Sequence, residues 1–161
     1  SGGAEVATPM AQIERSILTK ASPETVFRIY RDVEHWNRWD PDTRSSHLSG
    51  GLTLGANGHL TPARGRTVPM QVTAVVDNRS FTVTSRTALF RMDFEHELEP
   101  FGDGTRIAHR VRFAGMLKPL LVLIVGQQLK RGLPVTLHQL KQLAESVQAQ
   151  EHAGRPPSGA G

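Results

Sequence analysis

Two histidines, His96 and His109, are the side chains of this sequence that are best placed to do chemistry. They lie in two runs, residues 90–98 and 105–113, in which apolar and charged side chains alternate as in half-buried strands. The segment 100–104, rich in Gly and Asp, joins the runs and predicts an antiparallel hairpin. Both histidines take the place of an apolar residue on the apolar face, so we expect them inside the protein.

The charged faces of the two runs indicate how the hairpin pairs. One run is acidic and the other basic, and if Glu99 opposes Arg106, then His96 faces His109. The same register pairs Phe94 with Val111 and Leu98 with Ile107. A slip by one residue would turn the arginines into the interior, so the pattern resists such a slip.

Three interpretations of the histidine pair are open at this point. In the first, the pair is structural, with the rings bonded to each other, to water or to a hydroxyl such as that of Tyr30. In the second, it is a polar anchor for a carbonyl, carboxylate or phenol of a ligand. In the third, it is catalytic, with one imidazole as the acid or base of a cyclisation or dehydration. Zinc would need a third ligand such as His59 or Asp93, and Asp93 is expected to point outward, so no metal is predicted.

The motifs of the common enzyme classes are absent from this sequence. There is no G-x-S-x-G, no H-E-x-x-H, no phosphate-binding loop and no dinucleotide-binding glycine pattern. There is also no cysteine, which excludes disulfides and thiol catalysis. We therefore expect a binding protein rather than an enzyme, and no cofactor.

The segments around the hairpin predict one sheet with a few helices. A strand over 12–19 precedes residues 22–25, Ser-Pro-Glu-Thr, which are typical of a helix start. A short helical segment over 33–39 carries Trp36 and Trp39 on one side. The apolar period then changes to two, which predicts further strands over 44–48, 58–61, 68–77 and 80–86.

A long helix is predicted to follow Gly115 and to end near Val147. Its second half has a stripe of leucines opposite polar residues, and Pro134 is expected to kink it without ending it. Its first half is apolar nearly all round, so we expect residues 120–125 to be buried. The alternative is that they form a surface patch for a protein partner or a membrane.

Together these elements predict an α+β fold. A curved antiparallel sheet of about six or seven strands wraps around the long kinked C-terminal helix, with two short helices after the first strand. Such a sheet does not close tightly on one helix, so we expect a cavity between them. The folded domain is expected to span residues 11–147, with a disordered tag over 1–10 and a disordered tail over 148–161.

Several segments together resemble a known family. They are Ile13-Glu-Arg-Ser-Ile17, Ala21-Ser-Pro-Glu-Thr-Val-Phe27, Asp32-Val-Glu-His-Trp-Asn-Arg-Trp-Asp-Pro41, the hairpin at 97–106, and the terminal helix with Leu129-Lys-Arg-Gly-Leu-Pro134. The chain resembles the START-like superfamily (the SRPBCC group), in its polyketide cyclase/dehydrase and lipid-transport branch. The resemblance implies the helix-grip fold, but it implies function only broadly, because members include ligand carriers, aromatase/cyclases and lipid-transfer domains.

The expected cavity lies between the inner face of the hairpin and the terminal helix. Arg64 and Arg66 lie in a loop that can border its entrance, and Trp36 packs over its mouth or touches the ligand. The residues expected to contact ligand are Trp39, Met70, Phe90, Met92, Phe94, His96, His109, Val111, Phe113, Leu121, Val125 and Gln128.

The composition is that of a globular protein, with 38% hydrophobic and 21% charged residues. Although the net charge is +4, the basic residues are dispersed among acidic ones without a stacking motif, so we expect no nucleic-acid partner. No apolar stretch is long enough to cross a bilayer and none resembles a signal peptide, so we expect a cytoplasmic protein.

The leading hypothesis is a protein that binds or carries a small hydrophobic, aromatic or polyketide-like molecule. One alternative is a polyketide cyclase or dehydratase that uses His96 or His109 as acid or base. Another is a protein-interaction module that uses the Leu120–Val125 surface, and a homodimer is possible.

Overall fold

The computed structural model describes residues 11–155, which form seven strands, two α-helices and one short 3-10 helix. In chain order the elements are β1 (Ala11–Thr19), α1 (Pro23–Arg31), η1 (Val33–Arg38), β2 (Thr43–Leu48), β3 (Asn57–Pro62), β4 (Val68–Val76), β5 (Ser80–Arg86), β6 (Arg91–Phe101), β7 (Gly104–Ala114) and α2 (Lys118–Ala153).

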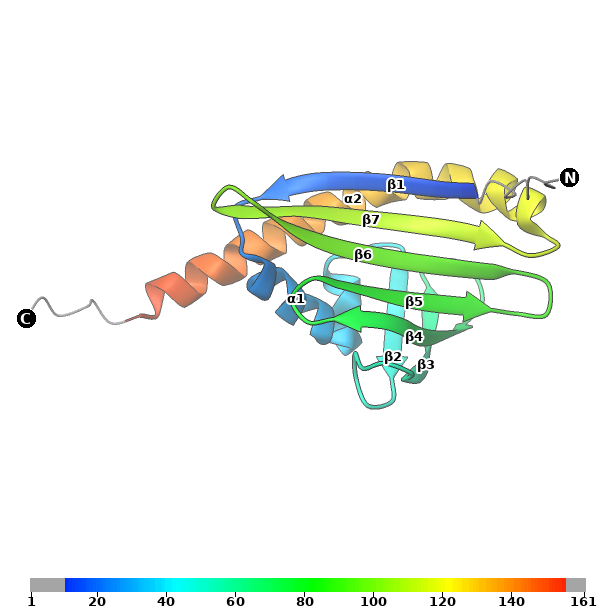
Figure 1. The fold of residues 1–161 in the computed structure, drawn as a ribbon, viewed down its shortest axis with the longest axis horizontal. Coiled ribbons are helices and arrows are strands. Elements are labelled where there is room, and N and C mark those ends of the chain that lie inside the picture. The colour runs from blue at the N-terminus through cyan, green and yellow to red at the C-terminus, as the bar shows by residue number, and fades with distance from the viewer. Residues whose placement is uncertain (1–10, 156–161) are drawn as a thin grey trace, which may run out of the picture.

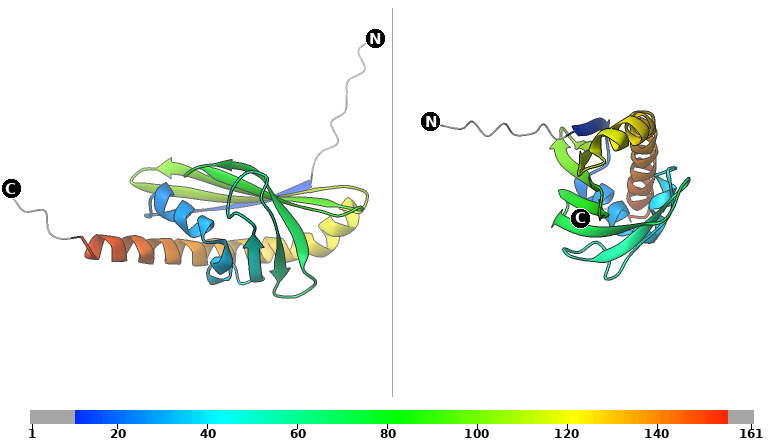
Figure 2. Two further views of the ribbon diagram at one scale, coloured as in Figure 1. Left: turned by 90° about the horizontal axis from the view of Figure 1, so that it is seen from below. Right: turned by 90° about the vertical axis from the view of Figure 1, so that its right-hand side faces the viewer.

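All seven strands belong to one antiparallel sheet in the order β1-β7-β6-β5-β4-β3-β2. From β2 to β7 each strand pairs with the next along the chain, while β1 lies at the far edge beside β7. The sheet curls around α2, as Figure 1 and the end-on view of Figure 2 show. The predicted fold class, a curved sheet gripping a long C-terminal helix, is confirmed.

Helix α1 begins where the sequence predicted. The Ser22 side chain accepts a hydrogen bond from the backbone N–H of Thr25, and Pro23 occupies the first turn. The apolar side chains of the helix, Val26, Phe27 and Tyr30, are buried. This burial brings Tyr30 to the concave face of the sheet.

The β6–β7 hairpin has the predicted register, with His96 opposite His109. The other predicted pairs, Phe94–Val111, Leu98–Ile107 and Glu99–Arg106, are also present. On the outer face the Arg110 guanidinium contacts Glu95 at 2.7 Å and Glu97 at 3.3 Å, so the predicted pairing of acidic and basic faces is confirmed. The register therefore turns both imidazoles toward α2.

Helix α2 is continuous through Pro134 and buries a stripe against the sheet. Figure 2 shows that its first turns are inclined to the rest of the helix. The buried stripe consists of Leu133, Leu137, Leu140 and Ala144, which agrees with the leucine period of the sequence.

The C-terminal end of α2 corrects one expectation. A disordered tail was predicted from residue 148, but the helix continues to Ala153 because polar contacts hold its last turns. The Gln148 side chain accepts a hydrogen bond from Ser22 N (2.7 Å) and donates one to Lys20 O (3.1 Å). The predicted tag over residues 1–10 lies outside the described residues.

The first half of α2 corrects a second expectation. Residues 120–125 were predicted to be buried, but Leu123 and Ile124 are 73% and 62% exposed. Leu121 and Val125, on the opposite side of the same turns, face the sheet. A helix contacts a curved sheet along one stripe only. When a segment is apolar on all sides, its sequence does not indicate which side forms that stripe.

Candidate ligand-binding cavity

A cavity of about 360 Å³ lies between the concave face of the sheet and the first half of α2. All the residues predicted to contact ligand line it, with the exception of Phe113. The sheet contributes Met92 and Phe94, the loop before β6 contributes Phe90, and α2 contributes Leu121 and Val125. The alternation of β6 and the α2 stripe thus bring apolar side chains together around one space.

Phe113 was expected in the cavity wall and is instead packed into the core. Its side chain is 1% exposed and contacts a cluster that includes Ile13, Met92 and Leu133. The Phe113 side chain points to the inner face of the sheet, as the alternation of the strand predicted. At this end of the sheet, however, neighbouring side chains fill the space in front of the ring, which the strand period alone does not reveal.

The sequence analysis missed several residues that line the cavity. Val83 and Ser85 are on the inner face of β5, where strand alternation with Phe81 could have identified them. The others are Asp40 and Asp42 after η1, Leu129, Leu133 and Thr136 of α2, and six residues of the other strands: Thr43, Leu60, Pro62, Val68, Glu95 and Arg110. Trp36 and Arg64, placed near the mouth by the sequence analysis, also line it.

One end of the cavity holds a group of aromatic and polar rings. The Tyr30 hydroxyl and His109 Nε2 are 2.8 Å apart and share a hydrogen bond. The His96 ring is stacked on Phe81, with 4.0 Å between centroids, and meets the His109 ring edge-on at 4.6 Å. Trp39 packs against His109 from the loop after η1 (5.9 Å). The hydroxyl partner proposed for the histidines is therefore present.

Burial keeps this group of rings uncharged near neutral pH. Desolvation lowers the pKa of His96 from 6.5 to about 4, and two backbone hydrogen bonds oppose it only in part. Desolvation also lowers the pKa of His109 well below its ordinary value, and repulsion from His96 adds to this effect. Burial raises the pKa of Tyr30 well above its ordinary value.

The tautomer of His96 follows from its backbone contact. His96 Nδ1 lies 3.3 Å from the carbonyl oxygen of Phe81, which can only accept a hydrogen bond. The proton of the neutral ring is therefore on Nδ1, and Nε2 carries a lone pair. His96 is partly accessible on the cavity side, whereas His109 is buried. His96 can thus accept a hydrogen bond from a hydroxyl or amide of a bound molecule.

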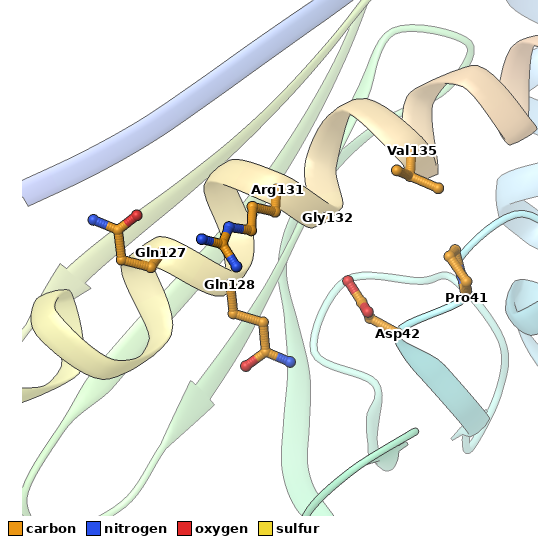
Figure 3. A pocket seen from close by; sticks show the side chains of 7 residues that line it. All are labelled: Pro41, Asp42, Gln127, Gln128, Arg131, Gly132 and Val135. Carbon is orange, nitrogen blue, oxygen red and sulfur yellow. The ribbon is translucent and has the colours of Figure 1, made fainter.

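An outer groove of about 440 Å³ lies between α2 and the segment after η1 (Figure 3). The groove and the cavity share Asp42 and Gln128, so the two spaces adjoin at these side chains. A Cβ atom at position 132 of α2 would overlap the Asp42 carboxylate, so a larger residue there would require that side chain to move. Arg131 projects into the groove beside this contact.

The Asp40 carboxylate ties the segment after η1 to α2 at the cavity rim. It accepts hydrogen bonds from the hydroxyls of Thr43 (2.8 Å) and Thr136 (3.2 Å) and from the backbone N–H of Asp42 (3.0 Å). Burial raises its pKa, while these hydrogen bonds act in the opposite direction. Asp40 is thus a structural link between the segment after η1 and α2.

The residues considered as third metal ligands lie away from the histidine pair. Asp93 is on the outer face of β6, where it accepts hydrogen bonds from Thr84 and Arg91. The His59 ring packs against the His47 ring, which β3 and β2 place opposite each other. Within residues 11–155 no group of three or more His, Cys, Asp or Glu side chains is arranged to hold a metal ion. Within the same residues no helix is long and apolar enough to span a membrane.

A curled antiparallel sheet that holds one long helix over an apolar cavity defines the helix-grip class of α+β proteins. The chain belongs to the polyketide cyclase/dehydrase and lipid-transport family, whose model matches residues 10–145. No curated protein matches the sequence closely enough to count as a relative. The resemblance predicted from the sequence is therefore confirmed at the level of the family.

Several solved structures have a similar fold. A START superfamily protein from Mycobacterium smegmatis is 16% identical, with a TM-score of 0.63 over 82% of this chain and 98% of its own. The di-domain aromatase/cyclase StfQ of the steffimycin biosynthetic pathway is 11% identical, with a TM-score of 0.69 over 87% of this chain and 52% of its own. Ara h 8.0201 is 16% identical, with a TM-score of 0.67 over 85% and 99% of the two chains. At these identities the comparisons establish the fold.

Proposed function

We propose that this protein binds a small, largely apolar and partly aromatic molecule in the cavity between the sheet and α2. The cavity, of about 360 Å³, has the size of small-molecule sites. Its lining combines aliphatic, aromatic and methionine side chains of β4, β6 and α2 with polar groups, among which His96 and His109 lie at one end. This combination, an apolar space with a neutral polar anchor at one end, is the observation that carries the proposal.

The ionisation of the histidines favours an anchor over a catalyst. A general base acts best when its pKa is close to the working pH. With its pKa lowered to about 4, the His96 imidazole is a weak base, and the lone pair on Nε2 is suited to holding a ligand hydroxyl. The alternative function, a cyclase or dehydratase with His96 or His109 as acid or base, requires the substrate to raise that pKa.

Native mass spectrometry tests the proposal directly. The purified protein is incubated with a total small-molecule extract of its expression host and sprayed under non-denaturing conditions. We expect one bound compound per chain, which acid denaturation releases and fragmentation assigns to the apolar or aromatic class. A bare mass both before and after incubation would contradict the proposal.

A substitution in the same experiment separates anchor from catalyst. His96→Gln removes the imidazole but keeps a polar side chain, and we expect it to retain less of the bound compound. If the compound is only bound, its mass and its chromatographic retention are the same after incubation with either protein. Retention is needed because a cyclisation without loss of water leaves the mass unchanged. If wild type removes water from the compound or cyclises it and His96→Gln does not, the catalytic alternative is correct.

A further inference from the structure

Two polar atoms in the cavity wall are buried without a hydrogen-bond partner among residues 11–155. They are the indole Nε1 of Trp39 and the hydroxyl Oγ of Ser85, in side chains that are 3% and 4% exposed. Nearly all buried polar atoms in native proteins have a partner. Both residues line the cavity, but the two polar atoms themselves are covered, so a bound molecule meets them only when the side chains shift.

Comparable side chains elsewhere in the protein are bonded. Trp36 Nε1 donates to the carbonyl of Tyr30 at 2.8 Å, and Ser46 Oγ donates to the carbonyl of Val33 at 2.6 Å. The neighbour of Ser85 in β5, Thr84, faces the outer side of the sheet and donates to Asp93 at 2.7 Å. The same residue types are thus bonded at the other positions and unbonded at two positions in the cavity wall.

The two unbonded atoms mark opposite ends of the inner wall. Trp39 and His96 both pack against the ring of His109, with 5.9 and 4.6 Å between centroids, so they share one end. Ser85 pairs with Met92 across the β5–β6 ladder, four positions along β6 from His96. At the rise of a strand this separation is about 13 Å.

We propose that the ligand is an elongated, flat molecule with an oxygen function at each end, one held by Trp39 and His96 and the other by Ser85. This inference rests on the proposed binding function and specifies the class of ligand. At the Trp39 end a hydroxyl satisfies both groups, because its oxygen accepts from the indole N–H while its proton is donated to His96 Nε2. At the Ser85 end a hydroxyl or a carbonyl fits, since the serine hydroxyl both donates and accepts. Between the two ends the aromatic and methionine side chains cover the apolar body.

A graded series of probes tests this arrangement. Trans-stilbene, its mono-para-hydroxy derivative and its di-para-hydroxy derivative share one flat frame and differ in the number of terminal oxygens. Their affinities are measured by fluorescence titration of the wild-type protein. We expect affinity to rise by about five- to tenfold with each hydroxyl, as a hydrogen bond to a buried, otherwise unpartnered group predicts.

Two matched pairs of substitutions assign each end. Ser85→Ala is expected to lower affinity for the dihydroxy probe to that of the monohydroxy probe, without loss of thermal stability. Ser46→Ala, the same change at a bonded serine, is expected to lower stability and leave probe affinity unchanged. Trp39→Phe is expected to weaken both hydroxylated probes while trans-stilbene binds as before. Trp36→Phe is expected to lower stability and to change affinity for the three probes by the same factor.

The outcomes separate this inference from the proposed function on which it rests. Equal binding of the three probes to wild type, or an unchanged affinity of Ser85→Ala for the dihydroxy probe, overturns the inference and leaves the binding function standing. No binding of any probe overturns the inference and counts against the binding function as well.

Discussion

At the scale of single residues, the inner wall is notable for polar groups that are held neutral. The Tyr30 hydroxyl and His109 Nε2 share a hydrogen bond of 2.8 Å in the interior. His96 lies beside them with a nitrogen that can accept a hydrogen bond. Burial opposes charge on each of the three groups, because it lowers the pKa of both imidazoles and raises that of the phenol. A neutral ligand is therefore the natural partner of this end of the cavity.

The depressed pKa values predict how stability depends on pH. In an unfolded chain His96 titrates near 6.5, whereas in the fold its pKa is about 4, so acid protonates the unfolded chain first. The contribution of the neutral His96 ring to the free energy of unfolding is thus fully present above pH 6.5. It is lost as the pH falls toward 4. Urea denaturation at a series of pH values should show a decrease in the free energy of unfolding across this range, on the order of 3 kcal/mol from His96.

A matched pair of variants isolates the contribution of the buried ring. His96→Gln should make the decrease between pH 6.5 and 4 smaller, and the part that remains comes from His109. His138→Gln, the same change at an exposed position of α2, should keep the wild-type slope. If His96→Gln and wild type lose stability in parallel over this range, the buried imidazole is not the cause.

At the scale of elements, the end of α2 is fastened by side-chain hydrogen bonds rather than by apolar packing. Gln148→Ala removes the acceptor for Ser22 N and the donor to Lys20 O, so we expect a loss of about 1 kcal/mol in thermal or urea denaturation. Gln150→Ala makes the same change at an exposed position of the same helix and should have little effect. Equal stabilities of the two variants would show that these hydrogen bonds do not fasten the helix.

The elements and their pairing could be predicted because they depend on local patterns. The β6–β7 register followed from acidic and basic alternation on one face and apolar alternation on the other, and the structure reproduces the His96–His109 pair. The start of α1 followed from the Ser22 cap. The extension of α2 to Ala153 could not be predicted, since it depends on contacts between Gln148 and a segment more than a hundred residues earlier in the chain.

At the scale of the whole molecule, the strand and helix periods gave the direction of each side chain but not the space in front of it. Met92 and Phe113 face the same way from paired positions, yet only Met92 lines the cavity. Likewise Leu121 and Leu123 are indistinguishable in an apolar run, and the curvature of the sheet decides which of them is covered. The alternation of β5 could have predicted that Ser85 faces inward. Only the assembled fold shows that its hydroxyl has no hydrogen-bond partner among the described residues.

This difference between the two leucines provides the most direct test of the binding cavity. Leu121→Trp fills the cavity from α2, whereas Leu123→Trp places the same side chain on the exposed side of the same helix. Titration of trans-stilbene should give saturable binding of one molecule per chain to wild type and to Leu123→Trp, and binding weakened by roughly tenfold or more to Leu121→Trp. Equal affinities of all three proteins would contradict the account, because the probe would then be bound outside the space beneath α2.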